Sequence, residues 1–122
     1  MSRRLNLVDA DGVRSQMITL LSSQTVDETK STAYYVGHAE DVTLFINYVG
    51  TVTAGEVVAE SAMTQTYTGT WVNEGNSTGA TDTQERISIS GIVDWIRVRI
   101  NTAIAGGGSV TVKLAARGSY KD

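Results

Sequence analysis

The sequence predicts an all-β protein, an antiparallel β-sandwich or jelly roll of about eight strands. The first observation is a series of short runs in which apolar and polar residues alternate, separated by turn residues. The second is the composition, with 12 glycines and no proline, because glycine serves the turns that need a positive φ. The third is the scarcity of helix-forming residues in periodic runs. A parallel sheet would need crossover helices, so we expect antiparallel pairing.

The expected strands follow one another without a linker, a repeat or a low-complexity tract. They are residues 4–8, 16–21, 33–36, 41–49, 56–63, 68–74, 85–90, 92–100 and 109–116. The run at 56–63 is ambiguous between a strand and a helical turn, and we favour a strand. Polar loops are expected at 22–32 and 75–83, a turn or short strand at 51–54, and tight turns at 9–12 and 105–108. We divide the chain into an N-terminal arm or short hairpin, residues 1–15, and one sandwich domain, residues 16–122.

Strand parity predicts which side chains form the core. Side chains alternate between the two faces of a strand, so the apolar residues of one parity should point inward. On the run at 41–49, Phe45 and Val49 have the opposite parity, so both faces of this strand are expected to be partly covered. The residues expected to point inward are Leu5, Leu7, Ile18, Leu20, Val42, Leu44, Ile46, Tyr48, Ile87, Ile89, Ile96, Val98, Ile100, Val110, Val112 and Leu114.

Composition excludes several classes of function. The 122 residues fit one domain, and 41% hydrophobic residues suffice for a core. The absence of cysteine excludes disulfides, cysteine-based zinc sites and a thiol nucleophile. A net charge of −3 argues against a uniform nucleic-acid-binding surface. The N-terminus lacks the apolar core of a signal peptide, and no run has membrane-spanning length. We therefore expect a protein made in a cytoplasm that binds neither membranes nor nucleic acid.

The sequence offers little for catalysis, metal binding or modification. His38 is the only histidine, and no serine lies in a G-x-S-x-G elbow, so we expect no enzyme activity. Residues Asp9 to Gly12 resemble the start of a calcium loop, but the later ligands are absent and a plain turn is the simpler interpretation. The sequon at Asn76 is expected to be an unmodified loop. No cofactor is predicted.

The strand at 92–100 carries the main candidate for a binding surface. If its aliphatic residues face the core, then Trp95, Arg97 and Arg99 face outward, and we expect Thr111 and Lys113 beside them on the next strand of a hairpin. One interpretation is a solvated face whose arginines pair with nearby acids. The other is a protein contact, because Trp and Arg are enriched at interface hot spots.

A basic pair, Arg3 and Arg4, starts the chain. Terminal residues are usually disordered. The functional alternative is an arm that becomes ordered on an acidic partner.

Three stretches together resemble a known group of proteins. They are "STAYYVGHAEDVTLFINYVGTVTAGEVVAES", "GTWVNEG" around Trp71, and "ISISGIVDWIRVRINTAIAGGGSVTVKLAAR". Over roughly residues 16 to 117 the chain is similar in style to small β-sandwich virion proteins of tailed bacteriophages, in particular head decoration (cement) proteins. The resemblance implies a structural role without catalysis, binding to the major capsid protein or other virion proteins, location in the virion, and a homo-oligomer, often a trimer. It supplies no contact residues, so Trp71, Trp95, Arg97, Arg99, Arg3 and Arg4 are candidates from the residues alone.

Two alternatives remain open. A neck or tail component would have the same architecture but would be present in few copies. A carbohydrate-binding β-sandwich would stack sugar rings on exposed aromatic residues, for which Trp71, Trp95, Tyr34 and Tyr67 are the candidates. A sugar site would need these side chains on one surface.

Overall fold

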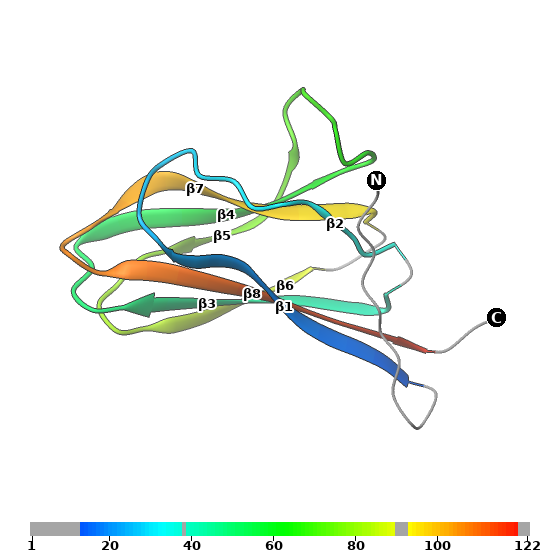
Figure 1. The fold of residues 1–122 in the computed structure, drawn as a ribbon, viewed down its shortest axis with the longest axis horizontal. Helices are drawn as coiled ribbons and strands as arrows, with labels where there is room; N and C mark the ends of the chain where they lie inside the picture. Colours follow the sequence, from blue (N-terminus) through cyan, green and yellow to red (C-terminus); the bar gives the residue numbers. More distant parts are fainter. Residues whose placement is uncertain (1–12, 38, 90–92, 120–122) are drawn as a thin grey trace.

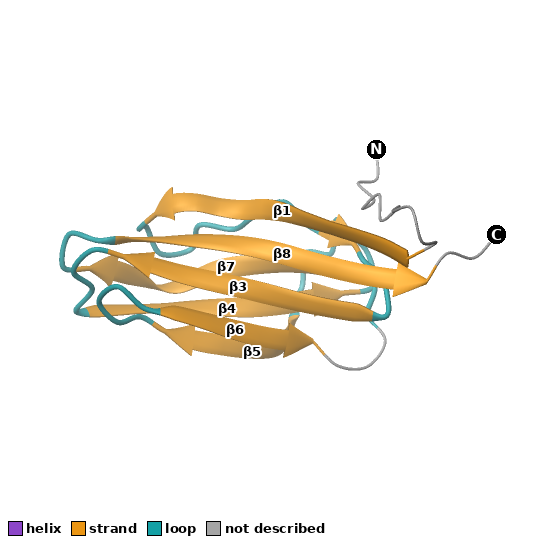
Figure 2. Ribbon diagram, turned by 90° about the horizontal axis from the view of Figure 1, so that it is seen from below, coloured by secondary structure: helices purple, strands orange, loops and turns teal. Residues whose placement is uncertain are grey.

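The chain folds into two antiparallel four-stranded sheets packed face to face, as predicted (Figure 1). The structure is a computed structural model that describes residues 13–37, 39–89 and 93–119. One sheet, here called the β3 sheet, has the order β1-β8-β3-β6, and the other, the β7 sheet, has the order β2-β7-β4-β5. The strands are β1 (Val13–Gln24), β2 (Tyr34–Tyr35), β3 (Asp41–Val49), β4 (Ala54–Ala62), β5 (Val72–Thr78), β6 (Gln84–Ile89), β7 (Trp95–Ala105) and β8 (Ser109–Ser119). Figure 2 shows the β3 sheet in front, with β1 at one edge and β6 at the other.

The core lies between the sheets, and within the described residues it is built mainly from the alternating residues that parity predicted. The central strands contribute Leu44 and Ile46 from β3, Val98 from β7, and Val112 and Leu114 from β8, all essentially without solvent exposure. Ile87 is half-buried, while Ile89 is buried at the end of β6. Antiparallel sandwiches place one face of each sheet in the core and leave the other outside, so two outer faces remain available for contacts.

Parity is interrupted in β1 by a register shift. Ile18 and Leu20 pack against the core only partly, whereas Leu21 is buried. The pairing with β8 shifts between Thr19 and Leu21, and an extra residue at such a bulge moves the following side chain to the other face. β1 begins at Val13, so residues 13–15, which the sequence division assigned to the arm, belong to the first strand of the sandwich.

Two expectations about β5 were wrong. The strand runs from Val72 to Thr78, so Trp71 precedes it, and the segment "GNST", expected to be a loop, lies inside it. β5 is an edge strand of the β7 sheet, where polar side chains remain exposed to water. Gly75 sits at its register shift with φ +148°, and a Cβ there would lie 2.8 Å from the Ile87 side chain. The bulge and this close approach explain a glycine within a strand.

The turn between β7 and β8 crosses from one sheet to the other. The sequence was expected to form a hairpin here, with both strands in one sheet, but β8 pairs with β1 and β3 while β7 pairs with β2 and β4. Gly106 and Gly107 have φ values of +108° and +98°, and Gly108 N donates to Thr51 O at 2.8 Å. Alternation fixes which residues face the core, but it is the same for a hairpin and for a connection between sheets.

Candidate interaction surfaces

The outer face of the β7 sheet carries the residues that parity placed there. Trp95, Arg97 and Arg99 alternate with the buried Ile96 and Val98 along β7, so their predicted outward direction is confirmed. They are half-buried rather than freely exposed. Their availability to a partner therefore depends on what the arginines contact within the chain.

The two arginines share one buried carboxylate. Arg97 Nε donates to Glu60 Oε1 and Arg99 Nε to Glu60 Oε2, each at 3.0 Å, and the exposed fractions of the three side chains are 17%, 20% and 7%. Glu28 Oε2 accepts from Arg99 Nη1 at 3.1 Å. Burial lowers the pKa of Arg99, but the hydrogen bonds and charges of Glu60 and Glu28 outweigh this effect and hold the pKa above its ordinary value. The acid that both arginines share, Glu60, lies on the adjacent strand β4.

Trp71 is buried and supports a loop rather than forming an exposed platform. The Arg97 guanidinium lies 3.9 Å from the centroid of the Trp71 ring, a cation–π contact. Trp71 Nε1 donates to Tyr67 O at 2.9 Å. The expectation that Trp71 is an exposed sugar-stacking residue was therefore wrong. Trp95 makes an edge contact with Tyr35, with ring centroids 5.5 Å apart, and is half-buried.

The same outer face continues into a polar network around Glu56. Asn76 Nδ2 donates to Glu56 Oε2 at 2.8 Å, and Asn101 Nδ2 donates to Glu56 Oε1 at 2.6 Å. These hydrogen bonds lower the pKa of the Glu56 carboxyl. Asn76, the residue of the sequon, thus lies in a strand and has a side-chain partner, contrary to the loop that was expected.

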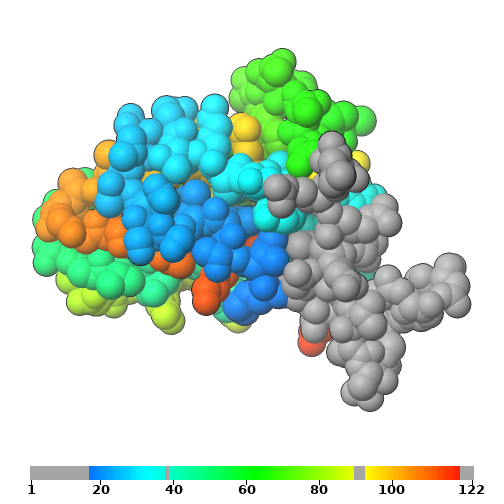
Figure 3. Space-filling view, viewed as in Figure 1, coloured from blue at the N-terminus to red at the C-terminus, as the bar shows by residue number. Residues whose placement is uncertain are grey.

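The segment between β4 and β5 projects beyond the β7 sheet, as the raised green loop in Figure 1 shows. It presents Met63, whose exposed fraction is 84%, together with the exposed Tyr67. The loop is ordered by the Trp71 bond to Tyr67 O and by Gln65 Nε2, which donates to Ala33 O at 3.1 Å. The same bulge stands out in the space-filling view (Figure 3).

A groove of about 640 Å³ lies at the base of this loop. Met63, Tyr67 and the exposed Val72 line it together with the carboxylates of Glu74 and Asp94. We call these five residues the loop patch. Glu74 Oε2 accepts a hydrogen bond from Ser61 Oγ at 2.6 Å. The loop patch is thus apolar and acidic.

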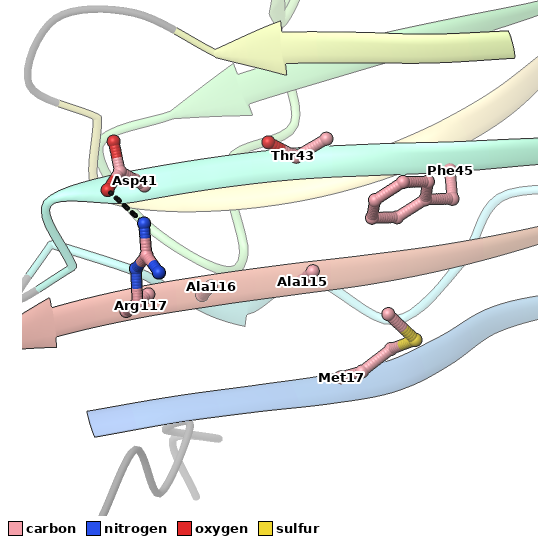
Figure 4. Close-up of a pocket in the computed structure, with 7 residues that line it drawn as sticks. All are labelled: Met17, Asp41, Thr43, Phe45, Ala115, Ala116 and Arg117. Atoms are coloured by element: carbon pink, nitrogen blue, oxygen red, sulfur yellow. Dashed lines mark ion pairs between the residues drawn. The ribbon is translucent and has the colours of Figure 1, made fainter. Parts of the chain in front are cut away.

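A shallow hollow of about 510 Å³ lies on the outer face of the β3 sheet (Figure 4). Met17 on β1 and Phe45 on β3 line it and are 55% and 40% exposed. Phe45 stands opposite Lys113 of β8 on one side and Arg86 of β6 on the other. Arg117 closes one end, 3.6 Å from Asp41. Arg86 and Lys113 flank Phe45 but lie outside the lining of the hollow, whereas Asp41 is part of it. We use the name hollow patch for the hollow and its basic neighbours, which are Met17, Asp41, Phe45, Arg86, Lys113 and Arg117.

Sequence reasoning missed the hollow patch because it placed Lys113 on the wrong face. Thr111 and Lys113 point outward from the β3 sheet. They therefore do not lie beside Trp95, Arg97 and Arg99, which are on the β7 sheet. The available signal was the outward parity of Phe45 within the run at 41–49. Joining Phe45 to Lys113 required the strand order, which parity does not provide.

Several predicted residues lie outside the described residues: Arg3, Arg4, Leu5, Leu7, Asp9, Asp11 and His38. Among the residues that are described, no group of three or more His, Cys, Asp or Glu side chains could hold a metal ion. No helix in this part of the chain is long and apolar enough to cross a membrane.

Neither a protein-family model nor a curated protein matches the chain. Among solved structures, the prophage-derived protein YomS of SPBc2 is similar with a TM-score of 0.59 and 16% identity, over 91% of this chain and 99% of that one. A chain of infectious bursal disease virus, Gx strain, gives 0.52 and 10%, over 88% of this chain and 32% of that one. The CBM36-1 domain of a xylanase from the hindgut metagenome of Trinervitermes trinervoides gives 0.50 and 7%, over 89% and 100%. At these identities the similarity establishes a shared β-sandwich fold.

Proposed function

We propose that this protein is a non-catalytic structural component of a bacteriophage virion, of the head decoration type, which binds the major capsid protein and stabilises the shell. The observation that carries the proposal is the presence of two surfaces with exposed large apolar side chains, the loop patch and the hollow patch, at different places on one sandwich. Contiguous exposed apolar surface in a folded domain marks contact sites. Two such surfaces suit a subunit that touches more than one neighbour.

The fold supports this role. The similarity to the prophage-derived protein spans nearly the whole length of both chains, and about a third of a viral chain has a similar fold. A two-sheet sandwich with two outer faces is a suitable scaffold for a repeated lattice. On such a lattice, weak individual contacts add up to strong retention, because each contact raises the effective concentration for the next.

The outer face of β7 around Trp95 and the basic pair Arg3 and Arg4 remain the predicted contacts with the shell. Arg97 and Arg99 are already paired with Glu60, so we propose that they shape this face and present Trp95, rather than supply free positive charge to an acidic partner. A partner that covers this outer face would add apolar contact to side chains that are already held in place, which reduces the entropic cost of docking.

The first test is the copy number of this chain in purified virions relative to the major shell protein. Near-stoichiometric abundance is expected for a decoration protein. A few copies per particle would favour the neck or tail alternative, and complete absence would overturn the virion role.

A second test is the thermal rupture of shells that lack the protein, with and without added wild-type chain. We expect added protein to raise the rupture temperature, and the Trp95→Ala variant to do so less. Val26→Ala is the control, because Val26 is exposed but lies outside the three surfaces described. Equal rupture with and without the wild-type chain would contradict shell binding.

One observation favours carbohydrate binding as a second candidate. Tyr67 is exposed at a groove that also holds Ser61, Glu74 and Asp94, and hydroxyl and carboxylate groups beside an aromatic ring are suited to sugars. The CBM36-1 domain has the same fold. Against this candidate, Trp71 is buried and Trp95 is only half-exposed. A glycan panel read by tryptophan fluorescence tests it, and a hit should be lost in Tyr67→Ala, whereas a flat panel would remove it.

A further inference from the structure

The loop patch and the hollow patch carry opposite charges. Among the described residues, neither Glu74 nor Asp94 forms an ion pair, and neither do Arg86 and Lys113. Glu74 and Asp94 line the groove beside the loop, while Arg86 and Lys113 flank Phe45 in the β3 sheet. The hollow itself holds one acid, Asp41, but this carboxylate faces Arg117 at 3.6 Å. The loop patch is therefore acidic, and the surface around the hollow is basic through Arg86 and Lys113, which have no ion pair in the described part of the molecule.

The two surfaces also differ in shape, because one lies on a projecting loop and the other is hollowed. The loop bearing Met63 and Tyr67 projects from the molecule beyond the β7 sheet (Figures 1 and 3). The hollow is a depression on the opposite sheet, bordered by Met17 and Phe45 (Figure 4). Both are apolar at their centres, so burying one in the other removes apolar area from water on both sides. A thioether against an aromatic ring is a favourable contact, which suits Met63 beside Phe45.

We propose that the loop patch of one copy of this chain docks into the hollow patch of a second copy, so that copies associate head to tail. The apolar side chains of the loop enter the hollow beside Phe45, and Glu74 and Asp94 face Arg86 and Lys113. The proposal deepens the assembly role above by naming the partner of these two surfaces.

A contact between two copies of the same patch is disfavoured. Pairing hollow with hollow would bring Arg86 and Lys113 of both copies together, and pairing loop with loop would do the same for Glu74 and Asp94. Like charges opposed across an interface cost several kcal/mol. The favoured contact joins two different surfaces, and such heterologous contacts produce a ring if the rotation closes and a filament if it does not. A three-membered ring would be the trimer expected from the family resemblance.

The experiment uses the isolated full-length chain in analytical ultracentrifugation over a concentration series. The loop variant is Met63→Lys with Tyr67→Ser, and the hollow variant is Phe45→Glu. All these side chains are exposed, so folding should be retained, and circular dichroism with a melting curve checks this. The wild-type chain should associate in a concentration-dependent manner, and each variant alone should associate at least about thirtyfold more weakly, as for loss of a hot spot. Val26→Glu, a matched change outside both patches, should associate like the wild type.

The decisive measurement is an equimolar mixture of the two variants. Each retains one intact patch, so the mixture should form a one-to-one dimer and nothing larger. Raising the salt concentration should weaken both this dimer and the wild-type assembly, because the exposed charges are screened.

Several outcomes would overturn the proposal. They are a wild-type chain that stays monomeric at every concentration, a mixture of folded variants that stays monomeric, or a single variant that associates as the wild type does. A monomeric wild-type chain that binds a labelled thymidine oligonucleotide through Phe45 would instead make the hollow a nucleic-acid surface. All these results concern the isolated chain, so they leave the copy number in virions as an independent test of the proposed function.

Discussion

Substitution of Glu60 by Gln tests whether the buried carboxylate organises the outer face of the β7 sheet. Glu60 accepts one charge-assisted hydrogen bond from each of Arg97 and Arg99 at 3.0 Å, and its side chain is 7% exposed. A glutamine retains the shape but removes the charge and turns one acceptor into a donor that faces an arginine N–H. Removing one partner of a buried ion pair costs about 3–5 kcal/mol.

The expected cost here lies at the lower end of that range, because both arginines keep other contacts. Arg99 retains Glu28 and Asn101, at 3.1 and 2.8 Å, and Arg97 retains the Trp71 ring. We therefore expect the free energy of unfolding to fall by about 3 kcal/mol. Because 1 kcal/mol corresponds to about 4 °C for a domain of this size, the melting temperature should fall by roughly 12 °C.

The matched control is Glu28→Gln, which alters an ion pair to the same arginine. The Glu28 side chain is 62% exposed, and exposed pairs contribute about 0–1 kcal/mol. Urea denaturation followed by tryptophan fluorescence measures both variants. If Glu60→Gln costs no more than Glu28→Gln, burial of the carboxylate is not what makes this ion pair important, and the reasoning fails.

Three further predictions concern the core, a turn and the contact between Arg97 and Trp71. Tyr48→Phe removes a buried hydroxyl that bonds Ser77 at 2.8 Å, and should cost about 1–2 kcal/mol in urea denaturation. Burial raises the pKa of Tyr48. As the pH rises above the ordinary tyrosine value of about 10, the unfolded chain ionises at this residue first, so the wild type should lose stability. The Tyr48→Phe variant should lack this contribution. Gly106→Ala should cost about 2 kcal/mol or more in thermal denaturation, because φ is +108° and the added Cβ would lie 2.8 Å from Thr51 O. Arg97→Met removes the guanidinium that covers the Trp71 ring. The tryptophan emission of this variant should therefore shift to longer wavelength. An unchanged spectrum would contradict the conclusion that Arg97 shields Trp71 from water.

The core could be predicted from the sequence because parity is a local property. Leu44, Val98 and Val112 face inward whichever strand lies beside them, since each sits in a run that alternates over several residues. The exception, Leu21, follows a register shift in β1. A bulge depends on how β1 meets β8, and the β1 sequence alone does not record it.

The surfaces could be predicted only in part, because they depend on which strands are neighbours. The outward direction of Arg97 and Arg99 followed from β7 alone, but their pairing with Glu60 needed the position of β4. Trp71 follows a polar, glycine-containing segment and looked exposed, yet Arg97 from another strand covers it. These contacts join residues far apart in the chain, and no local pattern encodes them.

The connection between β7 and β8 determines what the chain can contact. If these strands had formed a hairpin in one sheet, Lys113 would have joined Arg97 and Arg99 on a single basic face. Because Gly106 and Gly107 carry the chain across to the other sheet, Lys113 instead stands beside Phe45, which has Arg86 on its other side. Glu60 and Glu28 together pair with the two arginines of the β7 sheet, while Lys113 and Arg86 have no ion pair among the described residues. The crossing therefore places positive charge beside the hollow and away from the acidic loop patch, and this separation allows one chain to carry both halves of a contact between copies.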